Sequence, residues 1–181
     1  MKKTALAFAI ALALFGCKST STSARIDDQN ATATVVPKGP APEFDLENIA
    51  GGKLKSADLK GKIAVIDMWA TWCGPCKLEI PRFNKLTEDY KDKKVQIVGI
   101  TIESPYADIK PTVQETGIKY SVLVGNDAVV DGFGGVFGFP TTFIVTPEWK
   151  IYKKYLGAQA EKDERIRKDI EKLLAQQAAS D

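Results

Sequence analysis

A seven-residue apolar run, Ile63 to Trp69, constrains the fold more than any other segment, because two cysteines three residues apart follow it closely. Only Asp67 interrupts this run, so it predicts a strand that is buried on both faces rather than one with a face in water. After Cys73 and Cys76, apolar residues recur at helical spacing from Ile80 to Tyr90, with charges on the opposite face. A buried strand that leads into an amphipathic helix predicts an α/β domain.

The same alternation of strands and helices continues along the chain. Short β-branched runs predict strands at residues 95–102 and 121–124. Residues 141–146 and 150–156 are predicted to form a hairpin that turns at Pro147.

Two further helices are expected between and after these strands. A helix over residues 107–117 would break at Pro111 unless the proline lay in its first turn. Ile166, Ile170 and Leu173 form one apolar stripe, which predicts a helix near the C-terminus. The order of elements predicts a mixed sheet with helices on both faces.

Composition removes several classes of site. Histidine is absent from the 181 residues, and only three cysteines are present. Without imidazole the chain has no Ser-His or Cys-His nucleophile, no histidine-ligated zinc or copper, and no haem held by histidine. Three cysteines are too few for a four-cysteine zinc or iron–sulfur site. We therefore expect no metal and no cofactor.

Residues 1–16 are predicted to be a secretory signal peptide. Two lysines precede an apolar run, Ala5 to Phe15, that is shorter than the roughly 20 residues of a spanning helix. The end of this run and the two residues after it, Leu14 to Cys17, resemble the bacterial lipobox, so Cys17 is the expected lipid attachment site. An ordinary signal peptide with an unrelated cysteine is the alternative. Removing the two lysines takes 25 basic residues to 23, against 23 acidic ones, so no case for nucleic-acid binding remains.

Residues 17–42 are predicted to be a lipidated flexible tether. The segment is rich in Ser, Thr, Ala and Pro, and no aromatic residue occurs between Phe15 and Phe44. Such a segment buries too little apolar surface to order itself, and a coil of about 25 residues spans roughly 25–30 Å. Residues 43–181 are then the folded domain.

Cys73 and Cys76 are the residues best suited to chemistry. Residues at i and i+3 share a helix face, so one turn brings the two sulfurs within disulfide reach. Cys73 would lie at the helix N-terminus, where unpaired N–H groups and the macrodipole lower a thiol pKa from about 8.5 toward neutrality. Pro75 suits the first turn, since its missing N–H would have no partner there. A static structural disulfide is the alternative, and Trp72, Gly74 and Pro75 argue against it.

The segment from Asp67 to Lys77 is similar to the active-site stretch of the thioredoxin superfamily. The closer resemblance is to the membrane-tethered TlpA/ResA-type branch, through Glu79 to Pro81, Glu103, and the loop from Gly138 to Phe143. The stretch before the first strand also resembles that branch, and the likeness covers about residues 43–175. It implies a thioredoxin-like three-layer fold, with a central mixed β-sheet flanked by helices and an N-terminal β extension.

The resemblance implies a role for each residue around the dithiol. Cys73 would attack a substrate disulfide, Cys76 would resolve the mixed disulfide, and Asp67 or Glu103 would accept the proton of Cys76. Burial should raise the pKa of Asp67, because an unpaired charge in an apolar strand is costly. The alternatives are a locally satisfied carboxylate at Asp67 and an exposed, salt-bridged Glu103. Glu79 is expected to be structural.

The same resemblance predicts the substrate-binding surface. It implies a cis bond before Pro140, which would turn the Phe139 backbone toward the dithiol and offer its N–H and C=O to an extended substrate strand. Phe139 departs from the small or aliphatic residues of ordinary thioredoxins. Trp72, Gly74 and Pro75 complete the expected surface, and at least one of the two tryptophans near the cysteines should lie in the core.

We therefore expect a thiol-disulfide oxidoreductase whose only redox group is the Cys73–Cys76 disulfide. The Gly-Pro pair between the cysteines matches reducing members, which predicts a reductant fed by a membrane electron donor of the thiol-disulfide type. Its partners would be protein disulfides, including by resemblance apocytochrome c cysteines. We expect a monomer on the periplasmic side of the cell envelope, anchored through Cys17 to the inner or the outer membrane.

Three other functions compete with this one. Peroxiredoxins share the fold, but the Thr and Pro of their pattern would fall at Ala70 and Ile66, where this chain has neither. Copper-carrying relatives need a histidine and a wider cysteine spacing. A redox-sensing module that signals to a partner without turnover remains the alternative from a different class.

Overall fold

A computed structural model describes residues 39–179 of the chain. The predicted signal peptide, the lipid site at Cys17 and nearly all of the predicted tether lie outside the described residues. None of the helices within residues 39–179 combines the length and the apolar character that crossing a bilayer requires.

A five-stranded sheet forms the middle of the described domain, with strand order β5-β4-β3-β6-β7. The central strand β3 (Ile63–Trp69) pairs in parallel with β4 (Val95–Thr101), which pairs in parallel with β5 (Ser121–Val124). On its other side β3 pairs antiparallel with β6 (Thr141–Val145), and β6 with β7 (Ile151–Leu156). Every residue of β3 is buried, as its apolar run predicts. The predicted mixed sheet and the hairpin are both confirmed.

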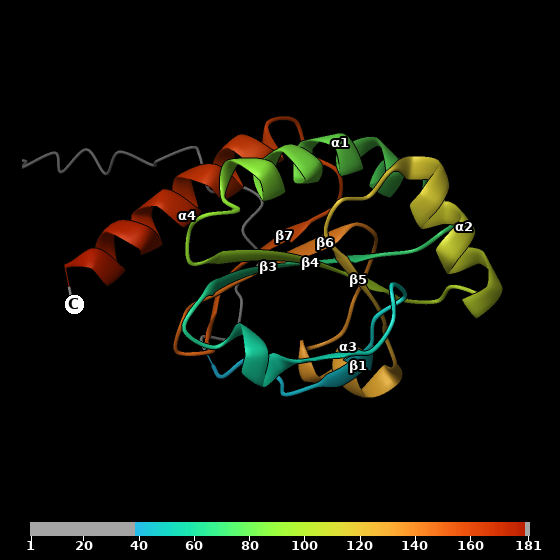
Figure 1. Cartoon of the computed structure of the whole chain (residues 1–181), viewed down its shortest axis with the longest axis horizontal. Coiled ribbons are helices and arrows are strands. Elements are labelled where there is room, and N and C mark those ends of the chain that lie inside the picture. Colours follow the sequence, from blue (N-terminus) through green and yellow to red (C-terminus); the bar gives the residue numbers. More distant parts are fainter. Residues whose placement is uncertain (1–38, 180–181) are drawn as a thin grey trace, which may run out of the picture. The chain divides into compact units, whose positions relative to one another are not determined.

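Three helices cover one face of this sheet (Figure 1). They are α1 (Gly74–Asp89), α2 (Tyr106–Thr116) and α4 (Lys162–Ala178). The apolar sides of all three helices join one hydrophobic core with side chains from the sheet.

The opposite face carries smaller elements (Figure 1). They are the hairpin of β1 (Asp45–Glu47) and β2 (Lys53–Lys55), the 3-10 turn η1 (Ser56–Leu59) and α3 (Asp127–Gly132). Their apolar side chains form a second core against the sheet. The result is the predicted three-layer arrangement, and β1 with β2 forms the predicted N-terminal β extension.

The register of β3 decides which layer each of its side chains enters. Successive side chains of a strand point to opposite faces. Val65 and Trp69 lie in the core beneath α1 and α4, whereas Ile66 and Met68 lie in the core on the other side. Asp67 shares the parity of Val65 and Trp69, so its carboxyl group points toward α1 and α4.

Helix α2 differs from its sequence prediction. Pro111 lies inside it rather than in its first turn, and the helix runs through. The proline removes an N–H that would bond the Ala107 carbonyl, but Ala107 and Pro111 are both exposed, so water can serve that carbonyl. Next to it, the Thr112 hydroxyl donates to the carbonyl of Asp108 at 2.7 Å and supports the same turn.

Candidate functional site

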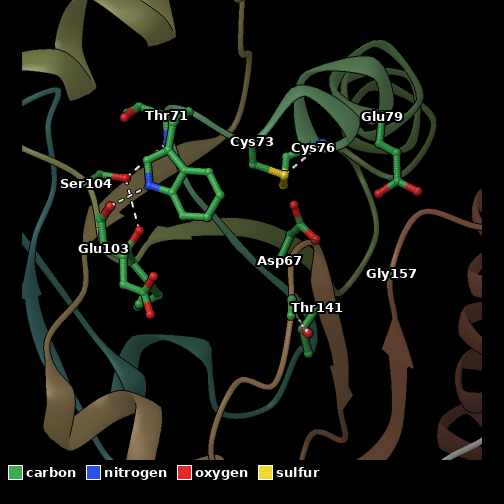
Figure 2. Close-up of a disulfide and its surroundings, with 12 residues drawn as sticks. Asp67, Thr71, Cys73, Cys76, Glu79, Glu103, Ser104, Thr141 and Gly157 are labelled. Atoms are coloured by element: carbon green, nitrogen blue, oxygen red, sulfur yellow. Dashed lines mark hydrogen bonds between the residues drawn. A yellow bond between two sulfur atoms is a disulfide. The ribbon is translucent and has the colours of Figure 1, made fainter.

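The two cysteines lie at the junction between β3 and α1. Cys73 is the N-cap of α1 and forms a disulfide with Cys76, across a Cα–Cα distance of 5.3 Å (Figure 2). The backbone N–H of Cys76 donates to the sulfur of Cys73 at 3.2 Å. Gly74 begins the helix and Pro75 lies in its first turn, as predicted. In the reduced state the same N–H and the helix dipole would stabilise a thiolate at Cys73.

Only Cys73 of the pair faces an open groove. Both cysteines are nearly buried, but Cys73 lines a groove of about 500 Å³ that Cys76 does not reach. The groove is lined by residues from the β3–α1 junction, the end of β4 and the loop before β6: Trp72, Cys73, Gly74, Pro75, Glu103, Val136, Phe137, Gly138 and Phe139. A client sulfur can therefore approach Cys73 but not Cys76.

The loop before β6 contains the predicted cis peptide bond. The bond between Phe139 and Pro140 is cis. On either side the loop is held to the sheet: the Thr141 hydroxyl donates to the Gly138 carbonyl at 2.7 Å, and the Gly157 N–H donates to the Pro140 carbonyl at 2.8 Å. Within residues 39–179 the N–H and C=O of Phe139 have no hydrogen-bond partner, so both are available to a bound strand.

Trp72 forms one side of the groove and is tied to the end of β4. Trp72 is 60% exposed, whereas Trp69 is a core residue, as expected for one of the two. The Trp72 indole N–H donates to the Glu103 carbonyl at 2.8 Å, and the Thr71 N–H donates to the Ser104 hydroxyl at 3.0 Å. Trp72 also packs edge-to-face on Phe139, with ring centroids 5.6 Å apart.

The two carboxylates proposed as proton acceptors lie in different environments. Glu103 is exposed at the rim of the groove, and Figure 2 shows its carboxyl group turned away from the disulfide. Its backbone has a φ of 49°, in the left-handed region that side chains other than glycine rarely adopt. Asp67 is buried and points toward Cys76 from below (Figure 2).

Burial raises the pKa of Asp67 to about 7. The main cause is loss of solvent around the charged form, which the positive charge of Lys162 opposes. The Thr142 hydroxyl donates to the Asp67 carboxylate at 2.7 Å and also lowers the pKa, whereas the negative charge of Glu79 raises it. The predicted upward shift is confirmed, and it places a titrating carboxyl next to the dithiol near neutral pH.

A buried ion pair close to Asp67 was not anticipated from the sequence. The ammonium group of Lys162, the first residue of α4, lies 2.5 Å from the carboxylate of Glu79 on α1. Both side chains are more than 90% buried, and Lys162 also donates to the Gly157 carbonyl at 3.4 Å. Lys162 and Glu79 are 83 residues apart, so no local pattern could pair them. The predicted structural character of Glu79 fits this pairing, and the charges of both partners also act on the pKa of Asp67, Lys162 lowering it and Glu79 raising it.

This arrangement can carry thiol–disulfide exchange. It provides a cysteine at a helix N-terminus, a second cysteine one turn behind it, and a buried carboxyl group that titrates near neutrality. Among residues 39–179, no cluster of three or more His, Cys, Asp or Glu side chains could hold a metal ion.

The sequence is similar to known thiol-disulfide oxidoreductases, in agreement with the chemistry of the site. A family model described as the AhpC/TSA family matches residues 37–154. The thiol-disulfide oxidoreductase ResA of Bacillus anthracis is 33% identical over 119 residues, which are 66% of this chain and 69% of that protein. ResA of Bacillus subtilis (strain 168) is 32% identical over 121 residues, 67% of this chain and 68% of that protein.

Solved structures support the same fold. The crystal structure of a thiol:disulfide interchange protein of the thioredoxin family from Chlorobium tepidum TLS has a TM-score of 0.68 to this chain, with 25% sequence identity. The match covers 78% of this chain and 99% of that one. The predicted thioredoxin-like fold class is therefore confirmed.

We predict that Asp67→Asn stabilises the oxidised protein at pH 8 but much less at pH 4. The pKa of Asp67 is about 7 in the folded state, above its ordinary value of 3.8. At pH values between these two, Asp67 is protonated in the folded protein but ionised in the unfolded chain. The free energy of unfolding of the wild type therefore falls as pH rises from about 4 to about 7. Asparagine cannot ionise and should avoid this loss, which amounts to roughly 2–4 kcal/mol at pH 8. Urea unfolding at both pH values measures it, and an equal effect at both would contradict the assignment.

Proposed function

The chain belongs to the AhpC/TSA family and is a thiol-disulfide oxidoreductase of the ResA type; from that premise we propose that it acts outside the cytoplasmic membrane as a reductant of protein disulfides. The observation that carries this proposal is the arrangement of the dithiol. Cys73 faces an open groove, Cys76 lies behind it, and Asp67 points toward Cys76 from below (Figure 2). A disulfide that only braced the fold would need neither the groove nor the buried acid.

The reaction begins with the reduced protein. The Cys73 thiolate attacks one sulfur of a client disulfide, whose S–S bond breaks, and the departing client thiolate takes up a proton. A mixed disulfide now joins Cys73 to the client. The free N–H and C=O of Phe139 would hold the client backbone as an added strand during this step.

Cys76 completes the reaction. It gives its proton to Asp67, and the resulting thiolate attacks the Cys73 sulfur. The Cys73–Cys76 disulfide forms, the mixed disulfide breaks, and the second client thiolate leaves and is protonated. The client has gained two electrons and two protons, which a membrane donor of the thiol-disulfide type must return to the protein. We assign the proton acceptor to Asp67 rather than Glu103, because the Glu103 side chain is exposed and turned away from the sulfurs.

The direction of electron flow rests on the residues between the cysteines. Gly74 and Pro75 match the reducing members of the thioredoxin superfamily, and thioredoxin itself has a potential near −270 mV. Protein disulfides are the proposed substrates, and the resemblance to the ResA-type branch adds apocytochrome c cysteines as one client class. Ala70 and Ile66 lack the Thr and Pro of the peroxide-reducing pattern, so peroxide reduction is not proposed.

We predict that the protein accelerates reduction of insulin by dithiothreitol and that Cys73→Ser abolishes the acceleration. Cys76→Ser should instead stop at a mixed disulfide with the client, visible on a non-reducing gel, because the resolving thiol is gone. If the wild type and Cys73→Ser reduced insulin equally, the protein would be a non-catalytic module.

The same proteins test the direction. Equilibration with glutathione redox buffers, followed by a count of free thiols, should give a potential close to that of thioredoxin, about −270 mV. A value near −120 mV, as in the oxidant DsbA, would contradict the reductant proposal.

We propose that the chain is anchored through Cys17, with residues 17–42 as a tether that holds the domain off the bilayer. The support is the sequence pattern of residues 1–17 alone. Growth with labelled palmitate should label the wild type and not Cys17→Ala, and the variant should move from the membrane fraction to the periplasm. Fractionation of the labelled protein decides between inner and outer membrane. An unlabelled wild type would overturn the anchor and leave the reductase proposal intact.

A further inference from the structure

The groove beside Cys73 has a largely apolar lining, although it is open to solvent. Trp72 is 60% exposed and Phe137 is 83% exposed, and both line the groove together with Phe139. Among the described lining residues only Glu103 carries a charge. Exposed large apolar side chains that gather at one place mark a binding surface. We call Trp72, Phe137 and Phe139 the aromatic wall.

The loop that carries Phe137 has little support of its own. Gly134 and Gly135 have φ values of 80° and 82°, in the left-handed region that favours glycine. Their N–H groups bond back to α3, at the carbonyls of Asp131 and Val130. Within the described part of the chain, residues 134–137 receive one hydrogen bond from the sheet, and Lys154 of β7 donates it to the Gly135 carbonyl at 3.3 Å.

Lys154 is placed so that it fixes this loop from beneath. The residue is buried, with only 7% of its surface exposed, and it has no carboxylate partner within residues 39–179. Its ammonium group lies 5.5 Å from the ring centroid of Phe137 and 5.2 Å from that of Phe143, a β6 residue. A buried charge without an ion pair is costly, so these ring contacts and the single carbonyl are what retain it.

We propose that the aromatic wall selects client segments with a large apolar side chain two residues from the client cysteine, and that Lys154 is a positioning residue that holds Phe137 in this wall. The inference rests on the proposed function and adds a substrate class to it. Cys73 itself lines the groove, so a client whose sulfur reaches Cys73 must lay its neighbouring residues there.

The spacing follows from strand geometry. A client bound to the free N–H and C=O of Phe139 is extended, and in an extended segment residues i and i+2 point to the same side. When the client cysteine points toward Cys73, the second residue before or after it points into the same groove. An apolar side chain at that place would bury its surface against Trp72 and Phe137, whereas a serine would not.

Two matched peptides test the selection. Each has 11 residues and one central cysteine in a mixed disulfide with thionitrobenzoate, and they differ only in having Phe or Ser at both second positions from the cysteine. Attack by reduced protein releases the coloured thiol, and the rate is followed against peptide concentration. We expect the half-saturation concentration to be about tenfold lower for the Phe peptide, with limiting rates within about twofold.

Three variants locate the effect. Phe137→Ser and Lys154→Met should each reduce the ratio of half-saturation concentrations below about threefold. Leu78→Ser is the matched control, because Leu78 is 79% exposed on α1 but does not line the groove, and it should keep the wild-type ratio. Urea unfolding shows whether Lys154→Met folds. Phe137 lies on the surface, so Phe137→Ser should fold and tests the aromatic wall even if Lys154→Met does not.

The outcomes separate this inference from the function on which it rests. Equal half-saturation concentrations for the two peptides in the wild type, or an unchanged ratio in Phe137→Ser, would overturn the selection while the reductase stands. An unchanged ratio in folded Lys154→Met would overturn the positioning role. If neither peptide nor insulin were reduced, the proposed function itself would be wrong.

Discussion

The chemistry of this protein depends on where its central strand stops. Strand β3 is the central strand of the sheet and ends at Trp69. Helix α1 begins at Gly74, only a few residues later. Cys73 therefore caps a helix whose first N–H groups have no partner within the helix, and one of them, from Cys76, already points at the Cys73 sulfur. The same position stabilises the thiolate of Cys73 and exposes this residue to the groove. The junction of β3 and α1 therefore both activates the sulfur and makes it accessible to a client.

Beneath that junction three elements bring buried charges together. Asp67 comes from β3, Glu79 from α1 and Lys162 from α4. Lys162 pairs directly with Glu79, and its charge also opposes the effect of burial on the pKa of Asp67. Breaking a buried pair by removing one partner usually costs several kcal/mol, so Lys162 and Glu79 are best regarded as a unit that sets the electrostatic surroundings of Asp67. Its consequence for function is a carboxyl group at Asp67 that can exchange a proton near neutral pH.

Much of this site could be predicted from the sequence, because its signals are local. The apolar run of β3, the Cys73–Cys76 spacing and the loop before Pro140 each lie within a few residues, and the strand context alone was enough to predict a raised pKa for Asp67. Lys162 could not be predicted, because its partner lies on a different helix and only the packing of α4 against α1 brings them together. The burial of Lys154 could not be predicted for a related reason. A lysine in a strand at the edge of a sheet usually faces solvent, but here the residue is buried and contacts the loop of residues 134–137. The break expected at Pro111 did not occur, since the proline lies on the exposed side of its helix.

The pH dependence of Cys73 alkylation in the reduced protein tests most directly whether Cys73 is an activated nucleophile. The rate with iodoacetamide, followed from pH 4 to pH 9 with mass spectrometry to assign the modified cysteine, reports the thiolate fraction of Cys73. We expect a midpoint well below the value of about 8.5 for an ordinary thiol, because the helix N-terminus stabilises the anion. A midpoint at or above about 8.5 would contradict it, and Cys73 would then be one half of a structural bridge rather than a nucleophile.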